Sequence, residues 1–95
     1  MTIEELRTGL ENTISDLTSS GFDSIDPGII ETLNMYSTAA GELNMKEGKH
    51  LIENLLGAMN AIKEGKSKAE SGNVRLTALD FYVKKLSGSD TIEDL

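Results

Sequence analysis

Apolar residues recur along most of the chain at spacings of three and four, which is the periodicity of amphipathic α-helices. Nowhere do apolar and polar positions alternate over four or more residues, as they do in a half-buried strand. The pattern therefore predicts an all-α protein, a small antiparallel bundle of three to four helices with short connections. The densest apolar stripe lies in segment 49–63 and consists of Leu51, Ile52, Leu55, Leu56, Met59 and Ile62. We expect a helix over about 45–69, with Gly65 as an alternative end, to be the central element on which the other helices pack.

Two helix starts are marked by capping residues. Thr2 and Glu5 form a capping box, which predicts a first helix over about 3–18. Asp26 followed by Pro27 predicts the start of a second helix, because Asp caps free N–H groups and Pro is well tolerated at the first helical position. The connection between these helices contains two apolar residues, Phe22 and Ile25, which we expect to be tucked under the bundle.

The boundary between the second and third helices has two interpretations. Asn44 and Glu47 resemble another cap and its third-position partner, which favours a break near 42–44. The rival is one continuous helix from Pro27 past Ile62, which the glycines in this region disfavour.

The residue pattern in the C-terminal third predicts a turn, then a short helix and then a tail. Ser71-Gly72-Asn73 is a turn signal, and apolar residues at helical spacing follow over about 74–86. We therefore predict a single helical-bundle domain over 1–86 and a flexible acidic tail over 87–95.

The composition limits the kinds of catalytic and metal-binding sites that we expect in this chain. Of the 95 residues 38% are hydrophobic and 4% aromatic, with no Trp, so aliphatic side chains and Met must form the core. There is no Cys and only one His, His50, which removes thiolate chemistry and the usual zinc ligand sets. No general acid–base pair, nucleophile triad or phosphate loop is recognisable. We accordingly expect a protein that is not an enzyme and binds no metal and no cofactor.

The same composition bears on location. No apolar run approaches the roughly 18 residues of a membrane span, and the first residues lack the basic and apolar regions of a signal peptide. The absence of Cys is typical of a reducing compartment. We expect a cytoplasmic protein with no membrane contact.

Charge is spread unevenly along the chain. The net charge is −7, and residues 1–45 contain eight acids against one base, Arg7. Residues 46–86 contain eight bases and five acids, and residues 87–95 contain three acids. The bases of the second half are interrupted by acids, which argues against nucleic-acid binding because phosphate contacts need clustered, unopposed bases. The asymmetry instead favours pairing between the halves, within one chain or in a dimer.

His50 resembles a phosphorelay histidine only in its expected position on a bundle helix. Histidine phosphotransfer proteins carry a Lys three residues after the His, followed by a Gly, whereas Glu53 and Asn54 stand there in this chain. A negative charge would repel the phosphoryl group. The alternative interpretation is a surface His paired with Glu47 or Glu53, about one helical turn away.

The segment Gly21-Phe22-Asp23-Ser24-Ile25 resembles the phosphopantetheine attachment site of acyl and peptidyl carrier proteins. The resemblance implies that Ser24 would carry the prosthetic group and that the following helix would be acidic. It covers about ten residues. The segment before Ser24 is shorter than in carrier proteins, and Pro27-Gly28 replaces the residues usual there. The alternative interpretation is a loop that caps the second helix.

The remaining hypothesis is an interaction protein. Phe81 and Tyr82 are neighbours and cannot face the same core, so one of them should point outward and could form a small exposed apolar patch with Leu76 and Leu86. The alternative interpretation is that both are partly buried at the edge of a thin bundle. We predict a non-enzymatic adaptor, regulator or chaperone-like subunit that binds a protein partner or a second copy through an apolar helix face. Phage and secretion-system accessory proteins share this small, acidic, helical character, although no residue selects that class. The candidate partner-binding residues are Leu51, Leu55, Met59, Ile62, Phe81 and Tyr82.

Overall fold

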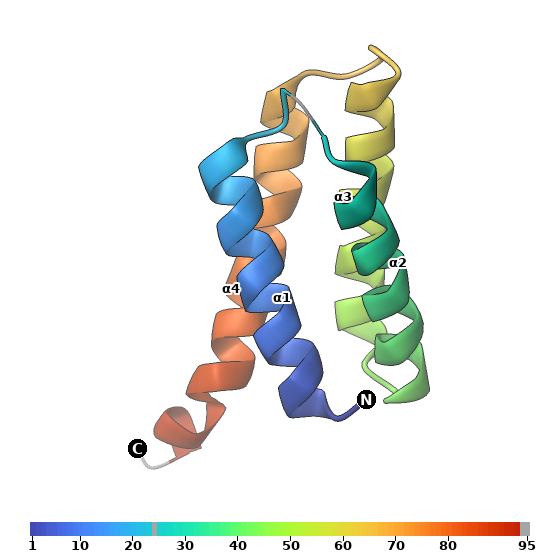
Figure 1. The fold of residues 1–95 in the computed structure, drawn as a ribbon. Coiled ribbons are helices and arrows are strands. Elements are labelled where there is room, and N and C mark those ends of the chain that lie inside the picture. Colours follow the sequence, from blue (N-terminus) through green and yellow to red (C-terminus); the bar gives the residue numbers. More distant parts are fainter. Residues whose placement is uncertain (24, 94–95) are drawn as a thin grey trace.

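The computed structural model describes residues 1–23 and 25–93, and side chains as far as Leu86 with the exception of Ser24. It contains four helices, α1 (Ile3–Ser20), α2 (Pro27–Glu42), α3 (Lys46–Lys63) and α4 (Ala69–Glu93), and no strand occurs in the described part of the chain. Successive helices run in opposite directions, so the chain forms an up-down-up-down bundle (Figure 1). The predicted all-α antiparallel bundle is confirmed.

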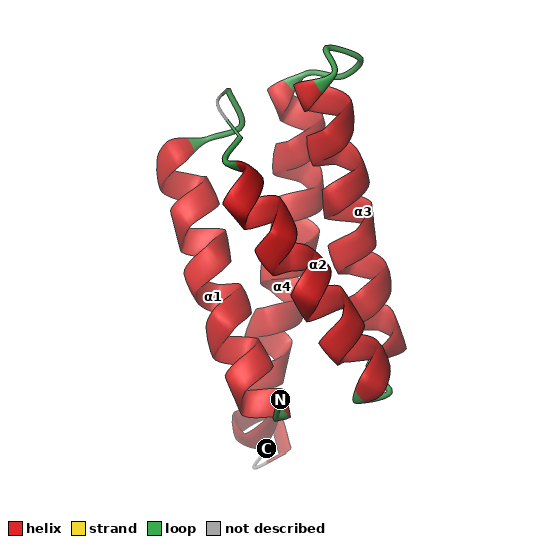
Figure 2. Cartoon of the chain, turned by 45° about the vertical axis from the view of Figure 1, so that its right-hand side comes forward, coloured by secondary structure: helices red, strands yellow, loops and turns green. Residues whose placement is uncertain are grey.

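The helices form a ring in which each has two neighbours. α1 packs against α2 and α4, and α3 packs against the same two helices. Within the described residues the backbones of α1 and α3 do not approach each other, because these helices lie diagonally across the bundle (Figure 2). The expectation that all other helices pack on the third one is therefore wrong. The apolar stripe of 49–63 is wide because α3 faces two neighbours and the bundle centre.

The core draws side chains from all four helices. In the middle of α3 the stripe is covered within a single copy, because Ile52, Leu55 and Met59 are fully buried and Leu56 nearly so. The largest side chains with almost no exposed surface are Leu6, Leu10, Leu17, Leu33, Ile52, Leu55, Met59, Leu79 and Val83. Aliphatic residues and Met thus carry the packing, as composition predicted.

Both predicted capping residues are in place. The Thr2 hydroxyl oxygen accepts a hydrogen bond from the Glu5 backbone N–H at 3.1 Å, and the Thr2 backbone N–H donates to Glu5 Oε1 at 2.9 Å. The Asp26 carboxylate accepts from the Gly28 backbone N–H at 2.9 Å and begins α2. Each bond satisfies an N–H group that the helix itself leaves without a partner.

The break between α2 and α3 is real, and the rival continuous helix is wrong. Asn44 does not cap α3 as predicted, because its φ of 61° places it in the left-handed region, and Met45 stands at the N-cap without a side-chain bond. Asn adopts this conformation more readily than most residues, so Asn44 turns the chain between the helices.

The α3–α4 connection begins at the earlier of the two predicted positions. α3 ends at Lys63, so the end near Gly65 is confirmed and the end near residue 69 is wrong. Gly65 is in the left-handed region (φ 78°) and turns the chain. Ser71-Gly72-Asn73 forms no turn, since α4 has already begun at Ala69. Gly72 faces the buried ring of Phe22 from the α1–α2 connection, and a Cβ at this position would lie 2.8 Å from that ring. This glycine therefore serves close packing inside a helix.

The last helix is longer than predicted. We expected it to end at Leu86, and α4 continues to Glu93. The predicted flexible tail, 87–95, falls on residues whose side chains, and for 94–95 also the backbone, lie outside the described part.

Candidate functional site

A mainly apolar groove lies on the outside of the α3–α4 pair. Its volume is about 410 Å³. α3 contributes Leu51, and α4 contributes most of the remaining wall. The lining consists of Glu47, Leu51, Val74, Thr77, Ala78, Phe81, Tyr82 and Lys85.

α4 carries apolar residues on two opposite faces. Leu76, Leu79 and Val83 point into the core and are almost fully buried. Val74 and Phe81 stand seven residues apart on the outer face, and each exposes 63% of its surface. Exposed Ala78 lies between them on the same side of the helix. The outer face therefore presents an apolar stripe to solvent.

Phe81 and Tyr82 separate as expected, one outward and one against the bundle. The ring of Tyr82 lies against α3 at Gly48, where a Cβ would be 2.9 Å from the Tyr82 hydroxyl oxygen. Burial raises the pKa of Tyr82, and the negative charge of Glu47 raises it further. Tyr82 is therefore neutral near pH 7 and forms the inner wall of the groove.

The companions of Phe81 differ from those predicted. Leu76 is buried and Leu86 is half-buried, so these two do not form an exposed patch with Phe81. Each helical residue rotates the side chain by about 100°, which puts Leu76 on the opposite face. Val74 and Ala78 occupy the positions that the patch requires.

Lys85 covers part of the Phe81 ring. Its Nζ lies 5.2 Å from the ring centroid, within the range of a cation–π contact. Lys84, next to it, pairs with Asp80 at 3.0 Å on the same helix. The C-terminal end of the stripe is consequently basic.

The predicted partner-binding residues of α3 divide into two groups. Leu55 and Met59 have no exposed surface, so their assignment to a partner-binding surface is wrong for this bundle. Leu51 and Ile62 are half-buried and pack against the core, and only Leu51 lines the groove. Of the predicted residues, the structure brings together Leu51, Phe81 and Tyr82.

A second hollow, about 380 Å³ in volume, lies between α1 and α4 and is mainly polar. Glu11, Ser15 and Thr18 line it from α1, and Asp80 and Lys84 from α4. Asp80 and Lys84 already pair with each other. Its walls contain no histidine, and it offers less apolar surface than the α3–α4 groove.

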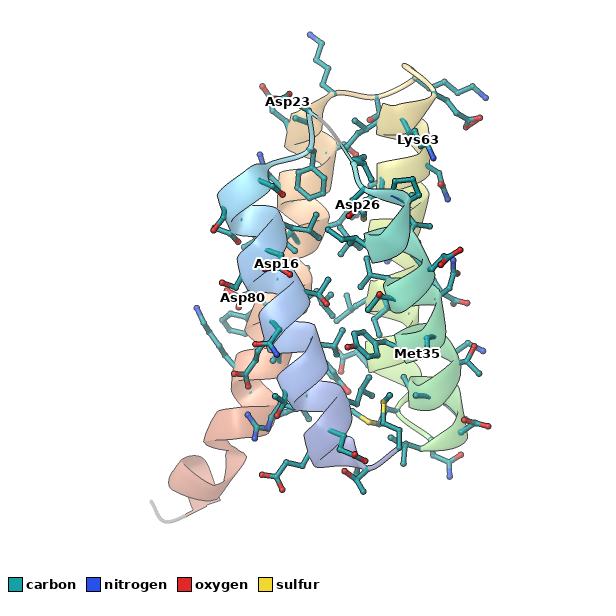
Figure 3. All side chains as sticks on the ribbon, viewed as in Figure 1. Asp16, Asp23, Asp26, Met35, Lys63 and Asp80 are labelled. Atoms are coloured by element: carbon teal, nitrogen blue, oxygen red, sulfur yellow. The ribbon has the colours of Figure 1, made fainter. Side chains whose placement is uncertain are left out.

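The charged residues lie on the surface. All eight acids of residues 1–45 are exposed, and Figure 3 shows three of them, Asp16, Asp23 and Asp26, on α1 and at the α1–α2 connection. Ion pairs between residues close in sequence join Arg7 to Glu4 and Glu11, Lys66 to Glu64, and Lys84 to Asp80.

Ser24, the residue of the carrier-protein alternative, lies outside the described residues. Its neighbour Asp23 is exposed, and Asp26 caps α2, which begins three residues after Ser24. The capping role foreseen for this loop is therefore present, and modification of Ser24 stays a prediction.

His50 is exposed on α3 and, within the described side chains, forms no ion pair with Glu47 or Glu53. The same residues contain no group of three His, Asp or Glu side chains placed to hold a metal ion. Within the described chain, none of the helices combines the length and apolar character required to cross a bilayer.

Sequence reasoning missed the groove residues Val74, Thr77, Ala78 and Lys85. A signal was present, because Val74, Ala78 and Phe81 recur at helical spacing on the side opposite Leu76, Leu79 and Val83. Val74 stands two residues before Leu76, about 200° away around the helix, so it faces outward while Leu76 faces the core.

Comparison with known proteins found no match among protein-family models, curated proteins or solved structures. The functional argument therefore rests on the geometry of this chain.

Proposed function

We propose that this protein is a non-enzymatic protein–protein interaction module, an adaptor, regulator or chaperone-like subunit, whose α3–α4 groove takes an amphipathic helix. One observation carries the proposal: Val74 and Phe81 are each 63% exposed on the same face of a folded helix and line one apolar groove. Contiguous exposed apolar surface on a small protein marks interaction sites.

The shape of the groove favours a helix as the occupant. Its wall follows α4 from Val74 to Lys85, about three turns. Helices that bind in grooves insert apolar side chains at spacings of three, four and seven. On the groove wall Val74, Ala78 and Phe81 recur at spacings of four, three and seven, so they can contact the apolar side chains of such a helix. Glu47 and Lys85 at the rim supply charges that fix the orientation of the bound helix.

A photo-crosslinking experiment tests the proposal. A photoreactive amino acid at Ala78, in the groove, is compared with the same residue at Met35, which is 54% exposed on α2. After irradiation in an extract of the native host, we expect protein adducts from position 78 and not from position 35.

The crosslinked protein is then purified and its affinity measured. Replacement of an aromatic anchor in an interface commonly costs at least tenfold in affinity, about 1.4 kcal/mol, so the Phe81→Asp variant should bind at least tenfold more weakly than the unmodified chain. Equal affinity, or equal adducts from both positions, would show that the groove is not the binding site.

A further inference from the structure

The outer face of α4 has an ordered sequence of exposed residues. It begins with the acid Glu70, continues with Val74, has small side chains at Thr77 and Ala78, and ends with Phe81 and Lys85. All of these residues are exposed. Acid, apolar, small, apolar and base thus follow one another over about four turns of one helix.

This order is self-complementary when two copies of α4 lie antiparallel. With Thr77 and Ala78 at the crossing point, Phe81 of each copy faces Val74 of the other. In the same register Lys85 of each copy faces Glu70 of the other. Small residues at the crossing let the two helix backbones approach closely, and large apolar residues flank them on either side.

The two-fold arrangement makes each contact occur twice. Dimers with two-fold symmetry use the same surface on both copies, so a suitable face must match its own antiparallel image. A parallel arrangement would instead place Glu70 against Glu70 and Lys85 against Lys85. Like charges facing each other disfavour that register and leave the antiparallel one.

The overall charge also favours the α3–α4 side of the bundle. Each copy has a net charge of −7, and the exposed acids of residues 1–45 cover α1, α2 and their connection. On α4 the exposed bases Arg75, Lys84 and Lys85 offset the acids. Two copies therefore meet with less repulsion through the α3–α4 side than through α1 or α2.

We infer that the partner helix of the α3–α4 groove is α4 of a second copy, bound antiparallel with Thr77 and Ala78 at the two-fold axis. This inference rests on the proposed function and names its occupant. The contact spans a few turns of one helix per copy, which is small for a protein interface. The dimer is therefore weak and forms with rising protein concentration.

Cysteine crosslinking tests the register, because the chain contains no Cys. Thr77→Cys places a thiol at the axis, and Thr38→Cys on α2 is a matched control. Both threonines are exposed within helices, and their hydroxyls donate to the carbonyl oxygen four residues earlier, at 2.8 Å for Thr77 and 3.2 Å for Thr38. Under mild oxidation the Thr77→Cys chain should form a disulfide-linked dimer much faster than the control. Equal rates overturn the inference.

Charge exchange tests the pairing of Glu70 with Lys85. In sedimentation velocity at rising concentration, Glu70→Lys and Lys85→Glu should each weaken dimerisation, and the double exchange should restore it. Phe81→Ala should remain monomeric while circular dichroism shows an intact bundle.

The experiments distinguish the inference that a second copy occupies the groove from the proposal that the groove binds a helix at all. A native chain that stays monomeric throughout, or a double exchange as weak as the single ones, overturns the second copy as occupant. The proposed function is judged separately, by the extract crosslinking at Ala78 and the affinity of the captured protein.

Discussion

α1 and α4 pack against each other and both bury apolar residues in the core, but only α4 also has an apolar stripe on its outer face. In α1, Leu6, Leu10, Ile14 and Leu17 all point inward, and the outer face from residue 4 onward is polar. In α4 an inner stripe of Leu76, Leu79 and Val83 is matched by an outer stripe that includes Val74 and Phe81. Each helix has two neighbours in the ring, α2 and α4 for α1, and α1 and α3 for α4.

This difference distinguishes apolar residues that stabilise the bundle from apolar residues that are available to bind a partner. A helix with two neighbours needs one apolar face to stabilise the bundle, and α1 has only that. The second stripe of α4 buries little surface within the single chain and adds little to the free energy of unfolding. Such a stripe gains free energy from burial only when another helix covers it. The following predictions test this contrast, from the largest expected effect to the smallest.

The inner face of α4 should be the most sensitive part of that helix. Leu79 has no exposed surface, so Leu79→Ala should reduce the free energy of unfolding by about 2–5 kcal/mol through lost burial and a cavity. Urea unfolding followed by circular dichroism at pH 7 measures it. Val74→Ala on the opposite face is the control, with an expected change within about 0.5 kcal/mol. Similar losses for both would remove the distinction between the faces.

Replacement of two glycines by Ala compares a closely packed position, Gly72, with an open one, Gly57. A Cβ at Gly72 would lie 2.8 Å from the buried Phe22 ring, whereas nothing lies within 4 Å of one at Gly57. Gly72→Ala should lower stability by about 1 kcal/mol, because overpacking exceeds the gain in helix propensity. Gly57→Ala should raise it by about 0.5–1 kcal/mol. Stabilisation by both replacements would show that the α1–α2 connection can move the Phe22 ring aside at little cost in free energy.

The start of α1 depends on its capping box. Thr2→Ala should cost about 0.5–1 kcal/mol. The hydrogen bonds from Thr2 lower the pKa of Glu5 from its usual 4.5. The stabilisation from Glu5 is therefore present above pH 4.5 and is lost as the pH falls through the lower pKa of the folded protein. Thr2→Ala keeps the backbone N–H that bonds Glu5, so Glu5→Gln, which removes the charge, tests this linkage. Urea unfolding between pH 6 and pH 3 should show the difference in the free energy of unfolding between the unmodified chain and Glu5→Gln shrinking toward acid. A constant difference would contradict this linkage.

The outer face of α4 should contribute least to folding. Phe81→Ala removes an exposed ring and its contact with Lys85, and the expected loss is about 0.5 kcal/mol or less. The measurement must be made at low protein concentration, because dimer formation would itself stabilise the native chain. A loss comparable to that of Leu79→Ala would assign Phe81 to the core.

The sequence by itself determined the helical class and the starts of α1 and α2. The apolar periodicity predicted an all-α bundle, and the Thr2–Glu5 box and the Asp26-Pro27 pair located the first turns of α1 and α2. These features are local, because a cap and the N–H groups it satisfies lie within one turn of each other. The divergent directions of Phe81 and Tyr82 also follow from helix geometry alone.

Tertiary structure decided the rest. Whether Gly72 ends a helix or accommodates a ring depends on Phe22, which is distant in sequence and reaches it only in the folded bundle. Likewise, Leu55 and Leu51 belong to one apolar stripe, yet packing buries the first and leaves the second at the rim of a groove. Only the closed ring of four helices decided that the outer stripe of α4 stays uncovered, because periodicity reveals an apolar face but not how many neighbours will cover it.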